Sequence, residues 1–167
     1  MIKARVLIAA VAALIAAREI RAQSPSDLIG EWGKSRMSSV DFVNPSTGAH
    51  ADPSGERTDI RFFPDGTYKL GWLLQSSLYN CSSRVFGYKT GVYAVDGSTL
   101  TVDVRTSTLT SRDTCHPEWN YEKKTPTTKA TYQWRMQQTR SGLALLIRDA
   151  SGKEEVYLKQ SGTPLLQ

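Results

Sequence analysis

Two histidines and two cysteines are the residues of this chain best suited to metal binding or nucleophilic chemistry. His116 directly follows Cys115, whereas His50 and Cys81 lie far from both in the sequence. Zinc sites normally combine closely spaced cysteine pairs with histidine, and this chain has no such pair. The His-Pro-Glu sequence that begins at His116 matches half of a deaminase signature, but the Cys-x-x-Cys half is missing. We therefore predict no metal site and no cofactor.

The sequence also lacks the arrangements that mark a catalytic nucleophile. Nucleophilic catalysis needs a base beside a serine or cysteine. The chain contains no Gly-x-Ser-x-Gly elbow and no glycine-rich phosphate loop. A pair of carboxylates from separate strands would not be visible in the sequence, so an enzyme remains a third and unsupported class. We predict no catalytic residues and a protein that binds another molecule.

The start of the chain has the pattern of a secretory signal. Lys3 and Arg5 form a basic region, and an unbroken apolar run, VLIAAVAALIAA, follows over residues 6–17. Twelve apolar residues are too few to span a bilayer, which needs about 20. A basic start, a short apolar run and a small residue further on are typical of an export signal.

Cleavage after Ala22 gives a signal peptide over residues 1–22 and a single domain over residues 23–167. Cleavage after Ala17 and an uncut anchor are the alternatives. Loss of residues 1–22 removes four basic groups and one acidic group, which leaves 17 basic and 15 acidic groups, a net charge of +2. No clustered basic stripe indicates nucleic-acid binding. We predict a periplasmic or secreted protein with no stable membrane insertion after cleavage.

The two cysteines fit an exported protein. An even cysteine count in an oxidising compartment favours a disulfide, here between Cys81 and Cys115. Closure of a loop of this length stabilises a fold by roughly 3–4 kcal/mol in the chain-entropy model. The alternative is a pair of buried thiols.

Alternating apolar and polar residues, separated by glycine turns, predict antiparallel strands along most of the chain. Residues 99–105 show the pattern clearly, because Leu100, Val102 and Val104 fall on one face and polar residues on the other. We expect strands at 28–34, 56–62, 68–74, 85–95 (as one strand or two), 99–105, 131–137, 143–148 and 154–159. The polar segments 37–55 and 107–128 are expected to be irregular. About eight strands are typical of a barrel or a sandwich, and closure into a barrel removes exposed edges.

The opening Gly30-x-Trp32 resembles the Gly-x-Trp start of lipocalin-like barrels, and the phrases FFPDGTY (62–68) and GVYAVDGSTLTV (91–102) resemble small exported bacterial members. The resemblance covers roughly residues 28–159. It implies an all-β, antiparallel up-and-down barrel with a cup-like interior that holds a small hydrophobic molecule. Trp32 would plug the closed end. Lipocalins usually place a late arginine over that tryptophan, and here Lys159 stands in the last expected strand.

Aromatic residues at alternating strand positions are the candidate ligand contacts. For any single residue, core packing is the simpler interpretation. As a group these residues could line a pocket, because small-molecule sites are mostly apolar and aromatic. The candidates are Tyr68, Trp72, Tyr93, Tyr132 and Trp134.

Two classes of binding protein follow from this pattern. The first binds a small, partly apolar ligand in the barrel interior, with the 37–55 segment as a partial lid. The second is an envelope-associated or inhibitor-type module that grips a protein partner with its loops and has a filled barrel. An open cavity favours the first class, and a packed interior favours the second.

We predict that Cys81 and Cys115 are bonded in the exported protein. Thiol labelling of unfolded, unreduced protein should therefore detect no reactive thiol, because both sulfur atoms are engaged. Labelling after reduction provides the control and should detect two thiols. Two reactive thiols without reduction would contradict the pairing.

Overall fold

A computed structural model describes residues 24–38, 42–43, 45–48, 50–51, 53–78 and 80–161. The predicted signal segment lies outside the described residues. Two short 3-10 helices are present in this part of the chain, η1 (Pro25–Leu28) and η2 (Pro117–Trp119). Neither has the length or the apolar character that a membrane crossing requires. The strands are β1 (Gly30–Met37), β2 (Phe42–Val43), β3 (His50–Ala51), β4 (Gly55–Phe62), β5 (Thr67–Leu78), β6 (Cys81–Asp96), β7 (Thr99–Asp113), β8 (Tyr121–Lys124), β9 (Lys129–Thr139), β10 (Gly142–Arg148) and β11 (Glu154–Lys159).

The large sheet closes into a ring, which confirms the all-β, antiparallel up-and-down barrel. Its strand order is β6-β5-β4-β1-β11-β10-β9-β7-β8, and an additional pairing between β6 and β7 closes it. Ring neighbours therefore follow chain order, and β1 meets β11 where the ends of the domain come together. β9 and β8 share one edge of β7, since β9 pairs with residues 99–103 and β8 with residues 108–111.

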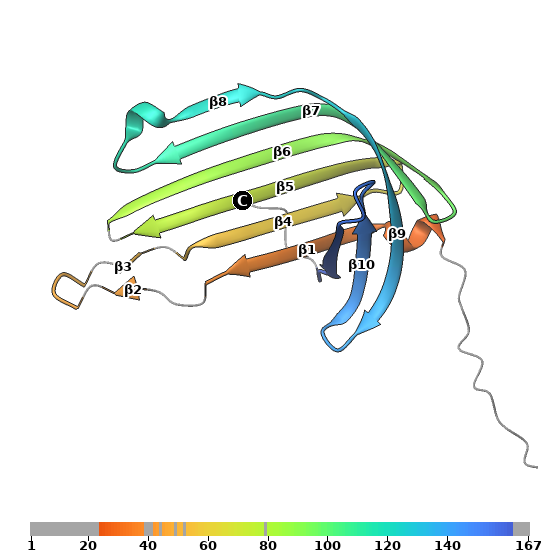
Figure 1. Cartoon of the computed structure of the whole chain (residues 1–167), viewed down its shortest axis with the longest axis horizontal. Helices are drawn as coiled ribbons and strands as arrows, with labels where there is room; N and C mark the ends of the chain where they lie inside the picture. Colours follow the sequence, from red (N-terminus) through yellow and green to blue (C-terminus); the bar gives the residue numbers. More distant parts are fainter. Residues whose placement is uncertain are drawn as a thin grey trace, which may run out of the picture.

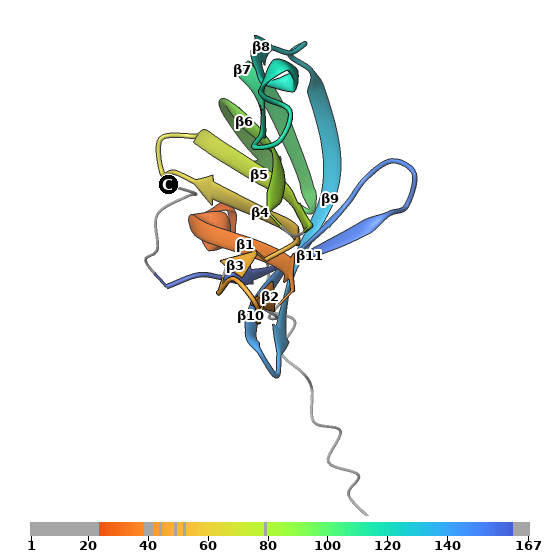
Figure 2. The same ribbon diagram turned by 90° about the vertical axis from the view of Figure 1, so that its left-hand side faces the viewer.

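The barrel is longer on one side than on the other (Figures 1 and 2). β5, β6 and β7 are the long strands, with 12, 16 and 15 residues, whereas β11 has six. The far halves of the long strands, together with β8, form a curved sheet beyond the closed ring. One end of the barrel is therefore closed, and the other opens beside this extended wall.

Two segments expected to be irregular contain strands. Residues 107–128 include the second half of β7, η2 and β8, and the described part of 37–55 contains a small β2–β3 ribbon. The reason is burial, because a strand alternates apolar and polar residues only where one face is covered. The outer half of β7 lies beyond the ring and reads TSTLTSRD, a strand with little apolar alternation. The 85–95 region is one strand, with a bulge between Thr90 and Gly91.

The predicted disulfide is present and lies at the far end of the long strands. Cys81 and Cys115 have an S–S distance of 1.98 Å and a Cα–Cα distance of 5.5 Å. Cys81 begins β6, and Cys115 follows the end of β7, so the bond ties the tip of the extended sheet. The described residues include no free cysteine.

Trp32 fills the closed end of the barrel. Its side chain is fully buried, and its indole Nε1 donates to the carbonyl oxygen of Leu28 in η1 at 2.7 Å. Lys159 lies over the indole, with Nζ 4.2 Å from the ring centroid, and donates to the carbonyl oxygen of Ile29 at 2.6 Å. Gly30 makes this contact possible, because a Cβ there would lie only 2.4 Å from that Nζ and its φ is +120°.

Replacement of Trp32 by alanine should lower the free energy of unfolding by about 3–5 kcal/mol, the usual cost of emptying a buried tryptophan site. Trp119→Ala is the matched control, because Trp119 is 59% exposed at the opposite end of the sheet. Urea denaturation of both variants measures the difference. Equal midpoints for the two variants would show that Trp32 is peripheral to the fold.

Candidate ligand-binding site

The barrel interior contains a cavity of about 180 Å³. Its wall is mainly apolar, three tyrosines project into it, and charged groups gather at one side. The lining residues are Ile60, Phe62, Tyr68, Leu70, Lys89, Leu100, Val102, Val104, Thr128, Ala130, Tyr132, Ile147, Asp149, Lys153, Glu155 and Tyr157. The barrel is therefore partly open inside, and no described residue of the 37–55 segment, which is predicted to act as a partial lid, lines the cavity.

Strand register explains why these side chains meet. Ile60 pairs with Leu70 across β4 and β5, and both point inward because successive residues of a strand face opposite sides. Tyr68 pairs with Gly91 on β6. A Cβ at Gly91 would lie 3.0 Å from Tyr68 Cε1 and 2.0 Å from the Asp103 carbonyl oxygen. The absent side chain therefore leaves room for the Tyr68 ring and for the close approach of β7.

Three tyrosines, Tyr68, Tyr132 and Tyr157, bring hydroxyl groups into the apolar cavity. Burial raises the pKa of Tyr68 to about 12, with a further contribution from Tyr132. Burial raises the pKa of Tyr157 to about 12 as well, with contributions from Glu155 and Tyr132. Tyr132 is thus close enough to influence both neighbours. Within the described residues, none of the three hydroxyls forms a hydrogen bond, so each is open to a hydrogen bond with another molecule.

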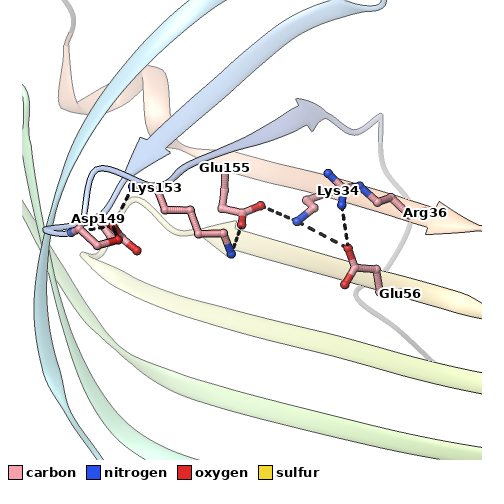
Figure 3. A network of polar contacts seen from close by, with 7 residues as sticks. Lys34, Arg36, Glu56, Asp149, Lys153 and Glu155 are labelled. Atoms are coloured by element: carbon pink, nitrogen blue, oxygen red, sulfur yellow. Dashed lines mark hydrogen bonds and ion pairs between the residues drawn. The ribbon is translucent and has the colours of Figure 1, made fainter.

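A network of ion pairs crosses the inner face beside the cavity (Figure 3). Glu155 on β11 pairs with Lys153 at 2.7 Å and with Lys34 on β1. Lys34 also lies 3.8 Å from Glu56 on β4, which lies 3.6 Å from Arg36. Hydrogen bonds from Lys153 and Lys34 lower the pKa of Glu155. The network therefore links β1, β4 and β11 on one side of the cavity mouth.

Asp149 completes this charged side from the turn between β10 and β11. Its Oδ1 accepts hydrogen bonds from the backbone N–H groups of Ser151 at 2.9 Å and Lys153 at 3.0 Å. A hydrogen bond from the Ser151 hydroxyl, together with these two backbone bonds, lowers the pKa of Asp149. The carboxylate thus fixes the turn that carries Lys153 to the mouth.

The five aromatic residues predicted to contact ligand separate into three positions. Tyr68 and Tyr132 line the cavity. Trp72 lies further along β5 and covers Gly87 of β6, where a Cβ would lie 2.1 Å from the indole Nε1. Tyr93 and Trp134 do not line the cavity.

Tyr93 and Trp134 belong to the packed end of the core. Trp134 is 2% exposed, and its indole Nε1 donates to the Gly97 carbonyl oxygen at 3.2 Å. The Tyr93 hydroxyl donates to the Phe63 carbonyl oxygen at 2.9 Å, and its ring meets the Phe62 ring edge-on at 4.9 Å. Because both have partners within the fold, their contacts are those of structural core residues.

Tyr157 and Lys89 line the cavity but were not among the predicted contacts. In β11, Glu155, Tyr157 and Lys159 share the inner face, whereas Val156 and Leu158 fall on the other face. The apolar residues Val156 and Leu158 therefore suggest that the outer face of this strand is the one that faces the barrel interior. The pairing of Lys89 with Leu70 across β5 and β6 places the lysine inside the ring, and only the register reveals this position.

The cavity lining offers apolar side chains for contact with a small molecule and tyrosine hydroxyls for hydrogen bonds to it. Among the described residues, its lining includes no histidine and no cysteine. Its two carboxylates, Asp149 and Glu155, have lowered pKa values, whereas a general acid needs a raised one. The lining offers apolar contact, phenolic donors and an uneven distribution of charge.

No model of a known protein family matches this chain, and no curated protein matches it.

Tyr68, which is buried, and Tyr157, which is half-buried, should produce a separate titration step at high pH. Phenolate absorbance of the folded protein should show ionisation near pH 12 that Tyr68→Phe/Tyr157→Phe removes. Since both folded pKa values lie above the ordinary value of 10.0, stability is retained below pH 10 and falls as pH rises toward 12. Tyr121→Phe, at an exposed position, should leave that step unchanged. Complete titration of the folded protein near pH 10 would contradict the burial argument.

Proposed function

We propose that the protein is an exported, lipocalin-like binding protein that holds a small, partly apolar molecule inside the barrel. The observation that carries the proposal is an apolar cavity containing three tyrosine hydroxyls without hydrogen-bond partners among the described residues. A ligand with an apolar surface would contact the apolar side chains of the cavity wall, and a hydrogen-bonding group on it would pair with the tyrosine hydroxyls.

Cavity size indicates the dimensions of the ligand. Drug-sized ligand pockets usually measure about 300–1,000 Å³, whereas an engineered apolar cavity of about 150 Å³ holds benzene. The cavity of this barrel, about 180 Å³, falls near the smaller value. The proposed ligand therefore places a single ring, or a group of similar size, among the tyrosines.

The closed end of the barrel supports the relationship to lipocalin-like proteins. Trp32 is buried there beneath the cation of Lys159, a lysine at the position where the resemblance implies a late arginine. The Cys81–Cys115 bond supports an oxidising compartment. We therefore propose that the protein acts in the periplasm or outside the cell.

Binding is proposed in preference to catalysis because of the protonation states at the cavity. The carboxylates there are held ionised by hydrogen bonds, and the pKa values of the buried tyrosines are raised away from neutrality. Neither shift moves a group toward the neutral pKa that general acid–base catalysis favours.

A protein-interaction role is the second candidate, and one region of the surface favours it. Leu78 and Trp119 are 68% and 59% exposed near the disulfide-linked tip of the sheet. Large exposed side chains are common at protein interfaces. In this alternative, the cavity would have no ligand and the tip would contact the partner.

Filling the cavity should abolish ligand binding without unfolding the barrel. Ala130 lines the cavity on β9, so Ala130→Phe would place a ring in the space proposed for the ligand. Nuclear magnetic resonance titration with single-ring aromatic compounds should show saturable binding to the original protein and none to this variant. Ala94→Phe is the matched control, because Ala94 is exposed on β6.

Thermal denaturation should show that both phenylalanine variants remain folded. Equal binding by Ala130→Phe and the original protein would locate the ligand elsewhere. Absence of saturable binding by the original protein would reject the cavity as a ligand site and favour the protein-interaction candidate.

A further inference from the structure

Lys89 gives the cavity a preference for charge. We propose that the ligand is a small organic anion, of the aryl carboxylate type, whose charge is met by Lys89 and whose oxygens accept from the tyrosine hydroxyls. The inference rests on the proposed function and specifies the chemical class of the ligand.

The position of Lys89 is fixed by the sheet. It is half-buried in the middle of β6, pairs with Leu70 of β5 on one side and Ser107 of β7 on the other, and lines the cavity. No carboxylate of the described residues forms an ion pair with it. A half-buried cation without a counter-ion is unfavourable, because partial desolvation is not repaid.

The other charges at the mouth balance one another. Three cations and three carboxylates gather on this side of the cavity, and all six belong to the connected network of polar contacts in Figure 3. The cations are Lys34, Arg36 and Lys153, and the carboxylates are Glu56, Asp149 and Glu155. Among the described residues that line the cavity, Lys89 is therefore the cation that has no carboxylate partner, whereas Lys153 is paired with Glu155.

The tyrosines favour the same ligand chemistry. Their hydroxyls are protonated at neutral pH and can donate to an anionic oxygen, as the ammonium group of Lys89 does. Hydrogen bonds to an ionised acceptor are about twice as strong as those between neutral groups. A cationic ligand would be repelled by Lys89, and a neutral one would leave its charge unmet. A cavity of about 180 Å³ suits an anion that places a single ring and one acidic group inside it.

Benzoate and benzamide test the proposal, because they share size and shape but differ in charge. Each is titrated into the full-length mature protein, and the dissociation constants are measured by nuclear magnetic resonance. Benzoate should bind the original protein more tightly than benzamide. Lys89→Gln should weaken benzoate about tenfold, as expected for the loss of one charge-assisted contact, and should leave benzamide unchanged.

Two further variants separate the charge of Lys89 from general structural effects. Lys89→Arg retains the charge and should retain the preference for benzoate. Lys129→Gln removes an exposed lysine of β9 and should change neither affinity. The anion inference would be overturned if benzamide bound more tightly than benzoate, or if Lys89→Gln kept the preference for benzoate. Either result would leave the proposal that the cavity binds a ligand intact. Binding of neither probe to the original protein would overturn the proposed function as well.

Discussion

The barrel depends on a short pairing between β1 and β11, the first and last strands of the large sheet in chain order; we call this pairing the seam. β1 and β11 share only two register pairs, Trp32 with Lys159 and Gly33 with Leu158, whereas β6 and β7 pair along nearly their whole length. The seam is reinforced where the Gln160 backbone N–H donates to the Glu31 carbonyl oxygen at 2.9 Å. The Lys159 cation over the Trp32 ring also holds the two strands together. Without this seam the sheet would be an open curve, and the cavity would have no closed wall.

The asymmetry of the ring explains the character of the cavity. At the seam end, large apolar side chains fill the interior, and Trp32 and Trp134 are almost completely buried. Away from the seam, the six-residue β11 ends while β5, β6 and β7 continue. The charged side chains on this side reach solvent, since Lys153 is 71% and Glu56 48% exposed. Charged residues are tolerated on the inner face only where solvent is near. The unequal strand lengths of the closed sheet therefore explain why the barrel interior is apolar at the Trp32 end and carries charged side chains at the other end.

Much of the fold can be predicted from sequence, and the candidate site only in part. The expected strand at 154–159 has the observed bounds of β11, and the expected disulfide is present. The outer half of β7 and all of β8 were not predicted, because strands exposed on both faces have no apolar period. Tyr68 and Tyr132, which line the cavity, were selected because they alternate with polar residues in strands with one buried face. Tyr157 was missed because Val156 and Leu158 make the other face of its strand look like the core face. The inner position of Lys89 depends on register and bulge placement, which are properties of paired strands.

β8 forms an outer edge of the described sheet, and its composition bears on how the protein behaves at high concentration. One side of this strand pairs with β7, and no described strand covers the other. An uncovered edge offers backbone groups to a strand of another molecule, which is a common start of aggregation. All four residues of β8 are exposed, and they include Glu122, Lys123 and Lys124, with Pro126 shortly after. A second molecule that paired its own β8 with this edge would bring its Lys123 and Lys124 close to the same lysines of the first molecule, and like charges repel. The pairing would also reach Pro126, which has no backbone N–H to donate. The strand is also only four residues long, so the open side of the sheet is a poor template for intermolecular growth.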